Sequence, residues 1–207
     1  MHEPRSRLGW TLAALVALLF VWSVIHPRDL WTWFLEVAPV LIAAPILFAT
    51  RERFAWTPLV MVLIALHASL LIVGGRYTYA EVPAGFWVRD AFGLARNHYD
   101  RLGHFAQGFV PALIAREILL RKSPLVRGPW LFFLVTCVCL AISALYELVE
   151  WWTALASGEA AAAFLGTQGD PWDTQWDMFL ALCGALLAQL ALSRWHDRQM
   201  GRLAPAR

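Results

Sequence analysis

Residues 130–152 read WLFFLVTCVCLAISALYELVEWW, and the first 17 of these 23 residues carry no charged side chain. A helix of this length spans about 35 Å, because each residue adds about 1.5 Å. The hydrocarbon core of a bilayer is about 30 Å thick, so the stretch is long and apolar enough to cross it once. It therefore predicts a transmembrane helix.

Apolar residues dominate the whole chain: 59% of its 207 residues are hydrophobic, 15% are charged, and the mean hydropathy is +0.55. These values lie outside the range usual for soluble domains. Six runs are long enough to span a bilayer, at residues 8–25, 30–50, 54–74, 102–120, 130–152 and 176–195. We expect an all-α, polytopic bundle of about six transmembrane helices, in a single integral membrane domain over residues 1–207.

The first apolar run follows Arg5 and Arg7, as the core of a secretory signal would. The residues after it, VWSVIHPRD at 21–29, lack the small-residue cleavage pattern of such signals, which favours a retained helix. An odd number of cysteines on membrane helices argues against a disulfide framework. The chain has three inside predicted helices, Cys137, Cys139 and Cys183.

The basic residues predict the orientation. With both termini in the cytoplasm, 12 of the 17 arginine and lysine side chains lie on the inner side, as the positive-inside rule requires. These residues would contact the anionic inner leaflet, so the lipid bilayer is the expected partner and a nucleic acid is not. The acidic residues show the opposite bias, since 11 of 15 fall at or near the outer side.

Acidic and histidine side chains gather at the outer ends of three predicted helices. Ionisable groups in membrane spans usually face a bundle interior or a water-filled cavity, so we expect one outward-facing pocket. Three pairs spaced three or four residues apart share a helix face: Asp100 and His104, Glu147 and Glu150, and Asp173 and Asp177. Glu36 and His67 lie at a similar depth on the second and third helices.

Helix capping explains some of these carboxylates without any function. Asp170 precedes Pro171, a pattern typical of an N-cap followed by proline at the first helical position. Asp173 would then complement the helix dipole, and Asp100 would do the same for its own helix. Asp177 lies about one turn deeper, beyond the reach of capping.

Glu147 and Glu150 lie at the C-terminus of a predicted helix, where the dipole disfavours negative charge. Something must offset this cost, and the candidates are an arginine such as Arg96 or Arg101, a proton, or a bound cation. Both glutamates also lie close to each other and next to an apolar span. This pair gives the strongest indication of function in the sequence.

Carboxylates combined with imidazole suit divalent metal ions such as zinc, manganese, iron and magnesium. The chain contains neither a Glu-x-x-His pair nor an H-E-x-x-H motif, so the metal prediction rests on convergence of side chains alone. The expected catalytic residues are Glu147 and Glu150. The expected metal ligands are Asp100, His104, Glu147, Asp173 and Asp177.

Three classes of function stay open. A metal-dependent membrane enzyme would activate water to attack a lipid-linked or amphiphilic substrate, with Glu147 or Glu150 as general base. A proton- or cation-coupled transporter would need polar residues on the cytoplasmic side too, where the sequence offers little beyond Arg116 and Glu117. In a non-catalytic scaffold or sensor, the acids would form salt bridges with nearby arginines. The enzyme is the preferred hypothesis.

Three stretches resemble the motifs of a known family: YDRLGHFAQG at 99–108, YELVEWW at 146–152 and GTQGDPWDTQWDM at 166–178. They look like those of the YjdF-like family of bacterial inner-membrane proteins of unknown function. The resemblance implies a multi-pass integral protein of the bacterial inner membrane, but no known reaction. A fainter likeness, to VanZ-like membrane proteins, is analogy only.

The remaining signals concern the membrane interface. Tryptophans lie near both ends of the predicted helices, as in interfacial belts. Residues 77–99 form a long connection, either an interfacial loop or a short helix that acts as a lid over the pocket. Small residues on helix faces are compatible with a homo-oligomer.

Overall fold

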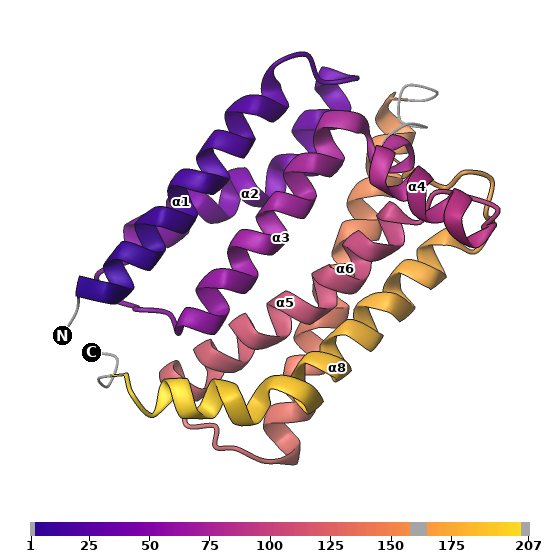
Figure 1. Cartoon of the computed structure of the whole chain (residues 1–207). Coiled ribbons are helices and arrows are strands. Elements are labelled where there is room, and N and C mark those ends of the chain that lie inside the picture. The colour runs from indigo at the N-terminus through magenta and orange to yellow at the C-terminus, as the bar shows by residue number, and fades with distance from the viewer. Residues whose placement is uncertain (1–2, 158–164, 204–207) are drawn as a thin grey trace.

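The computed structural model describes residues 3–157 and 165–203, with side chains from residue 7 onward except that of Ser157 (Figure 1). The side chain of Arg5, and Arg207, lie outside this part. The described residues form no strand, so the prediction of an all-α fold is confirmed. They form α1 (Glu3–Val24), α2 (Leu30–Thr50), α3 (Pro58–Tyr77), the short 3-10 helix η1 (Tyr79–Glu81), α4 (Pro83–Phe92), α5 (Tyr99–Lys122), α6 (Pro129–Ser157) and α8 (Asp173–Met200).

Five of the described helices are long and apolar enough to cross a membrane: α1, α2, α3, α6 and α8. Helix α5 is also long, at 24 residues, but it carries charged side chains near both of its ends. The chain is thus a polytopic membrane bundle, whereas a total of six spans stays a prediction. The first turn of α1 and the last turn of α8 lie at the same end of the bundle (Figure 1). Which side of the membrane this end faces also stays a prediction.

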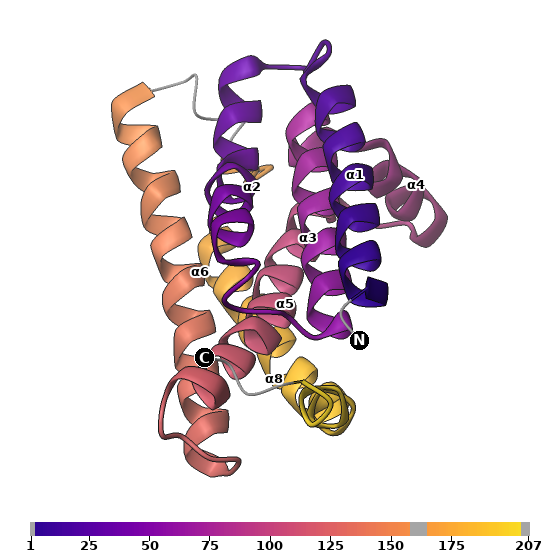
Figure 2. The same ribbon diagram turned by 90° about the vertical axis from the view of Figure 1, so that its left-hand side faces the viewer.

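The long helices form two groups of three (Figure 2). In one group α3 packs against α1 and α2, and in the other α5, α6 and α8 pack against one another. Contacts between α3 and α5 join the two groups. We call the end that holds α4 the α4 end, and the opposite end, where α1 starts and α8 stops, the termini end.

Several helix ends differ from those expected, for local reasons. Helix α3 starts at Pro58 rather than at residue 54, because proline disfavours a helical conformation in the residue before it and Thr57 is extended. Helix α6 runs on to Ser157, so Glu147 and Glu150 lie more than a turn before its end. The effect of the dipole at a helix C-terminus therefore explains less about these glutamates than we expected.

The expected N-cap at Asp170 is wrong. Helix α8 starts at Asp173, and residues 171–172 form a turn before it. The Asp170 Oδ1 atom accepts a hydrogen bond from the backbone N–H of Trp172 at 2.9 Å, which stabilises this turn rather than a helical one. Asp170 therefore stabilises the turn that precedes α8 and not the helix itself.

The structure places some of the residues expected at the interface. Residues 83–92 do form a short helix, α4, with Trp87 and Phe92 exposed on it. Trp33 departs from the expected belt, because it is buried between α1 and α2, where its indole N–H donates to Ser23 Oγ at 3.0 Å. The three cysteines are free thiols.

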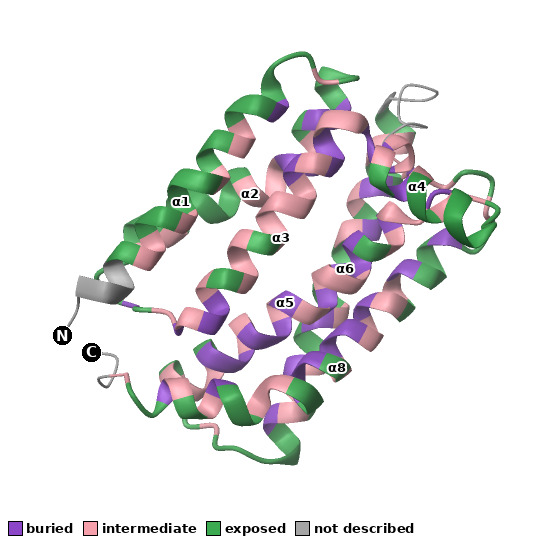
Figure 3. Cartoon of the chain, viewed as in Figure 1, coloured by how far each residue is buried: buried purple, intermediate pink, exposed green. Residues whose placement is uncertain are grey.

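Helices α5 and α8 make the most extensive contact in the bundle, and they run parallel to each other. Buried residues occur along the length of both helices (Figure 3). A Cβ atom at Gly108 would lie 1.8 Å from the carbonyl oxygen of Ala181, and one at Gly184 would lie 2.1 Å from that of Phe105. Only glycine permits this approach of the two backbones.

We expect Gly108→Ala to lower the free energy of unfolding by about 1–3 kcal/mol, because the added methyl group must push α8 away. Thermal unfolding in one detergent measures this change. Gly9→Ala is the matched control, since its Cβ atom would make only an ordinary contact, 3.6 Å from Met61 Sδ. Equal stability of the two variants would show that the α5–α8 contact is looser than described.

Candidate metal centre

Five buried side chains from α5, α6 and α8 meet near the α4 end, and we call them the acidic cluster: Asp100, His104, Glu147, Glu150 and Asp177. Potential ligand atoms of Asp100, His104 and Asp177 all lie within 4.8 Å of one another. The same is true of His104, Glu147 and Glu150. The two groups share His104, which therefore lies at the centre of the cluster.

The two ring nitrogens of His104 have different neighbours. Its Nδ1 atom lies 3.0 Å from the amide oxygen of Gln107, one turn further along α5. Because this oxygen can only accept, Nδ1 donates in this contact. When the ring carries a single proton, Nε2 then keeps a lone pair. Nε2 lies 3.5 Å from Asp100 Oδ1 and 3.9 Å from Asp177 Oδ2. This is how a metal-binding histidine is usually held, with its second nitrogen fixed by a polar neighbour.

Two carboxylate oxygens of the cluster have no hydrogen-bond donor, although both are buried. They are Glu147 Oε1 and Asp177 Oδ1, and their residues are 7% and 2% exposed. Such atoms are rare, because an unpaired buried polar group costs free energy. A cation bound here would remove this cost.

Asp173 lies beside the cluster but is paired elsewhere. Its Oδ1 atom lies 2.7 Å from an Nη atom of Arg96, and Asp170 lies 2.5 Å from an Nη atom of Arg101. Within the described residues, neither metal-ligand group includes Asp173. Of the five expected ligands, the structure thus brings together Asp100, His104, Glu147 and Asp177, and places Asp173 in an ion pair.

The loop before α8 closes over the cluster. Arg96 also donates to the backbone oxygen of Gly166 at 3.1 Å, and a Cβ atom at Gly166 would lie 3.7 Å from the Asp100 carboxyl carbon. Gln168 and Asn97 exchange two hydrogen bonds between side-chain amide and backbone, at 3.1 and 2.8 Å. The motif at 166–178 therefore serves partly as a cover, which the sequence analysis missed.

His98 precedes α5 at the edge of this cover. Burial, followed by the charges of Arg101 and Arg96, lowers the pKa of His98 below its ordinary value. A neutral ring can accept a hydrogen bond, and Arg101 lies 3.3 Å from its Nδ1 atom. His98 thus helps to orient Arg101 toward Asp170.

Polar groups from the other helix group face the same region. Glu36 is 1% exposed and accepts from the backbone N–H of Tyr79 at 3.4 Å, while its Oε2 atom has no donor. Burial, with smaller contributions from Tyr146 and Glu36, raises the pKa of Tyr79 well above its ordinary value, so the phenol stays neutral. His67 on α3 is half-buried, and its Nε2 atom, which is itself buried, lacks a hydrogen-bond partner.

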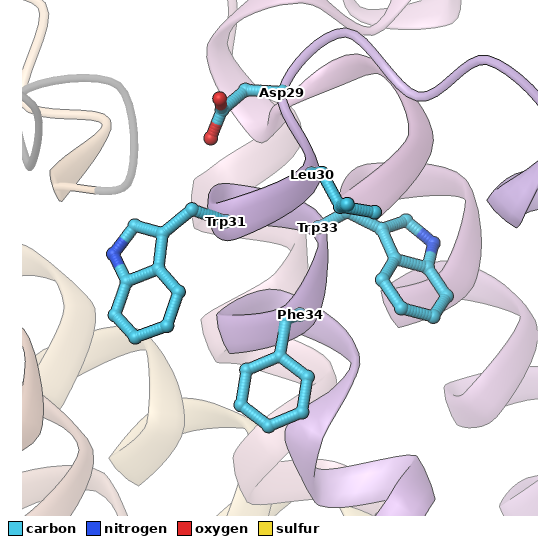
Figure 4. Close-up of a pocket in the computed structure, with 5 residues that line it drawn as sticks. All are labelled: Asp29, Leu30, Trp31, Trp33 and Phe34. Atoms are coloured by element: carbon cyan, nitrogen blue, oxygen red, sulfur yellow. The ribbon is translucent and has the colours of Figure 1, made fainter.

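An apolar cavity lies elsewhere. It measures about 620 Å³, is open, and is lined by Asp29, Leu30, Trp31, Trp33 and Phe34 on the first turns of α2 (Figure 4). Trp31 and Trp33 point to opposite sides of the helix (Figure 4), and Trp31 is half exposed. This aromatic surface contains no group of the acidic cluster and suits contact with lipid.

A second polar site lies at the termini end, and we call it the Glu117 network. Glu117 accepts hydrogen bonds from Thr57 Oγ1 at 2.8 Å, Arg121 at 2.6 Å and His196 Nε2 at 2.9 Å. Arg116 contacts His196 Nδ1 at 3.2 Å. Unlike the acidic cluster, this buried carboxylate has partners for both of its oxygens.

Comparison with known proteins places the chain in context. Residues 8–198 match a family described as "Predicted membrane protein (DUF2238)". The chain is 56% identical over 192 residues to "Inner membrane protein YjdF" of Escherichia coli (strain K12), covering 93% of this chain and 92% of that protein. No solved structure matches the chain.

We expect Arg96→Met to lower the free energy of unfolding by about 3 kcal/mol, because it leaves a buried carboxylate without its partner. Asp173→Asn in the same chain should recover part of that loss, with a coupling of at least about 1 kcal/mol in a double-mutant cycle. Arg89→Met is the control, since its partner Asp90 is exposed and the pair contributes at most about 1 kcal/mol. Strictly additive effects would mean that Arg96 and Asp173 are not partners.

Proposed function

The chain belongs to the DUF2238 family of membrane proteins, and we propose that its acidic cluster binds a divalent metal ion with which it catalyses a reaction on a lipid-linked or amphiphilic substrate. The protein is an integral, multi-pass protein of the inner membrane. The proposal depends on one observation above all. The buried oxygens of Asp177 and Glu147 lack a donor, at a point where three or more ligand atoms converge.

The negative charge of the acidic cluster favours the binding of a cation. Four carboxylates surround a single histidine, and among the described residues no arginine or lysine forms an ion pair with any of them. The nearby arginines, Arg96 and Arg101, form ion pairs with Asp173 and Asp170. Ionised carboxylates buried at this density repel one another, and a divalent ion would offset that repulsion better than one imidazole.

The geometry favours a particular ligand set. His104 Nε2, with Asp100 and Asp177 on either side of it, forms a group of one nitrogen and two carboxylates. Such a group suits zinc, manganese or iron, and it leaves coordination positions for water or substrate. Gln107 would hold the imidazole in the tautomer that this arrangement needs.

Glu147 and Glu150 would act as proton acceptors beside this ligand set. A bound divalent ion supplies an activated water at neutral pH. Glu147 Oε1 has no donor of its own and lies 3.7 Å from His104 Nδ1, on the other side of the ring from this ligand set, so it would accept the proton through an intervening water. Glu150, one turn along α6, would keep the local charge negative. These are the roles of a general base and its neighbour.

The packing between the two polar sites argues against transport. A transported ion would have to travel from the acidic cluster to the Glu117 network. Between them, Gly108 and Gly184 bring the backbones of α5 and α8 into contact, and Ala181, Ala185 and Leu113 are fully buried. Among the described residues, the side chains at this contact between α5 and α8 are apolar, which favours an enzyme with access from one side.

Metal analysis of detergent-purified protein tests the proposal. We expect a stoichiometric divalent metal in the wild type, and its loss in His104→Ala and in Asp177→Asn while both remain folded. Asp90→Asn is the control, because it removes the same charge from an exposed site at the same end. If the wild type holds no metal and none binds on titration, the metal enzyme is excluded. If metal is present, a screen of lipid-linked substrates should detect turnover that Glu147→Gln abolishes.

Gln107→Leu should weaken metal affinity by about 10–100-fold without removing a ligand, because the imidazole would lose its fixed orientation. Isothermal titration with the metal found in the wild type measures this change. Gln175→Leu is the matched control, since Gln175 is exposed on α8 close to the cluster. Equal affinities in both variants would rule out the assigned tautomer of His104.

A further inference from the structure

A small cavity opens at the termini end, far from the acidic cluster. Its volume is about 120 Å³. It lies between the last turns of α5, the first turn of α6 and the second half of α8. Its lining consists of Arg116, Arg127, Gly128, Leu131, Phe132, Gln189 and Ser193.

The wall of this cavity carries a surplus of positive charge. Arg116 and Arg127 both pair with Asp197, at 2.8 and 3.0 Å. Among the described residues, no other carboxylate pairs with either arginine. The nearby Glu117 is already paired with Arg121 and His196. Two guanidinium groups therefore share one carboxylate, and one positive charge is left to balance.

The two arginines differ in a way that suits a binding site. Arg116 is 5% exposed and is held in place by His196 and Asp197, so its position is fixed before any ligand arrives. The side chain of Arg127 is 59% exposed and lies in the connection between α5 and α6. A buried cation inside and an exposed cation outside can together hold an anion. Guanidinium groups suit phosphate because their N–H groups bond it in pairs.

The rest of the lining is amphipathic. Gln189 and Ser193 offer polar groups from α8, while Leu131 and Phe132 offer apolar contacts from α6. Val126 and Trp130, on either side of Arg127 in sequence, are 75% and 71% exposed. Exposed tryptophan of this kind is typical of the level of lipid headgroups. The cavity therefore lies where a headgroup and the first part of its chain would be found.

We infer that this cavity binds the phosphate group of an anionic membrane phospholipid, with Arg116 and Arg127 as the cationic ligands. Asp197 competes with the lipid for both arginines and so limits its affinity. The site is separate from the acidic cluster, and it would exist whether or not the cluster binds a metal. It would anchor the termini end of α5, α6 and α8 to the leaflet that surrounds it.

Native mass spectrometry of the detergent-purified protein, titrated with phosphatidylglycerol or with phosphatidylcholine of the same chains, tests this inference. We expect retention of phosphatidylglycerol and an affinity about tenfold lower in Arg127→Gln, because a charge-assisted hydrogen bond is lost. Arg198→Gln removes the same charge from an exposed position on α8 and should change the affinity by less than about threefold. Equal losses of affinity in both variants would overturn the inference, because lipid binding would then depend on the overall charge of the protein and not on this cavity.

Asp197→Asn provides a test in the opposite direction. It removes the competing carboxylate, so binding of phosphatidylglycerol should become stronger by about threefold or more. A merely structural role of Asp197 would not increase the affinity. Loss of binding in a variant that melts like the wild type would overturn the proposed competition.

Inorganic phosphate distinguishes the two sources of the anion. If the ligand is a lipid, millimolar phosphate should leave phosphatidylglycerol bound, because the apolar wall of Leu131 and Phe132 adds affinity that phosphate cannot use. Displacement of the lipid by phosphate at equal concentration would show that the cavity is a site for free phosphate, and the lipid would be excluded.

Discussion

The close contact between α5 and α8 is the constraint on which the rest of the structure depends. Gly108 and Gly184 let the two backbones touch, and a side chain at either position would separate the helices. Because the helices run parallel, one contact near their middle fixes the register at both ends. It places His104 beside Asp177 at the α4 end, and Arg116 beside His196 at the termini end. Both polar sites are therefore consequences of the same packing.

The two sites differ in whether their buried carboxylate oxygens have hydrogen-bond donors. In the Glu117 network every carboxylate oxygen meets a donor, so the network joins α3, α5 and α8 at a low electrostatic cost. In the acidic cluster, oxygens of Glu147 and Asp177 are buried without a donor. Buried oxygens of this kind cost free energy unless something pairs with them. This contrast within one chain is the reason for proposing a function for the cluster and a structural role for the network.

The sequence predicted the class of fold and the residue pairs of the cluster that share a helix face, because both depend on local spacing. Long apolar runs give helices, and residues three or four apart share a helix face, as Asp100 and His104 do. It failed where a distant residue decides. The partner of Asp173 is Arg96, 77 residues away, and no local pattern distinguishes that pairing from a metal ligand. The Glu117 network was missed for the same reason, since His196 lies 79 residues from Glu117.

By itself, then, the sequence determined that this is a multi-pass, all-helical membrane protein with acids concentrated at one end of its helices, because hydrophobic length and helical periodicity are properties of neighbouring residues. Only the tertiary structure decided which acids converge, which are neutralised by arginine, and which groups surround each nitrogen of His104. Those outcomes follow from the rotation and register of α5 against α6 and α8. The backbone contact at the glycines sets this rotation and register. Packing between helices is a relation among distant residues, and it becomes visible only when the chain is folded.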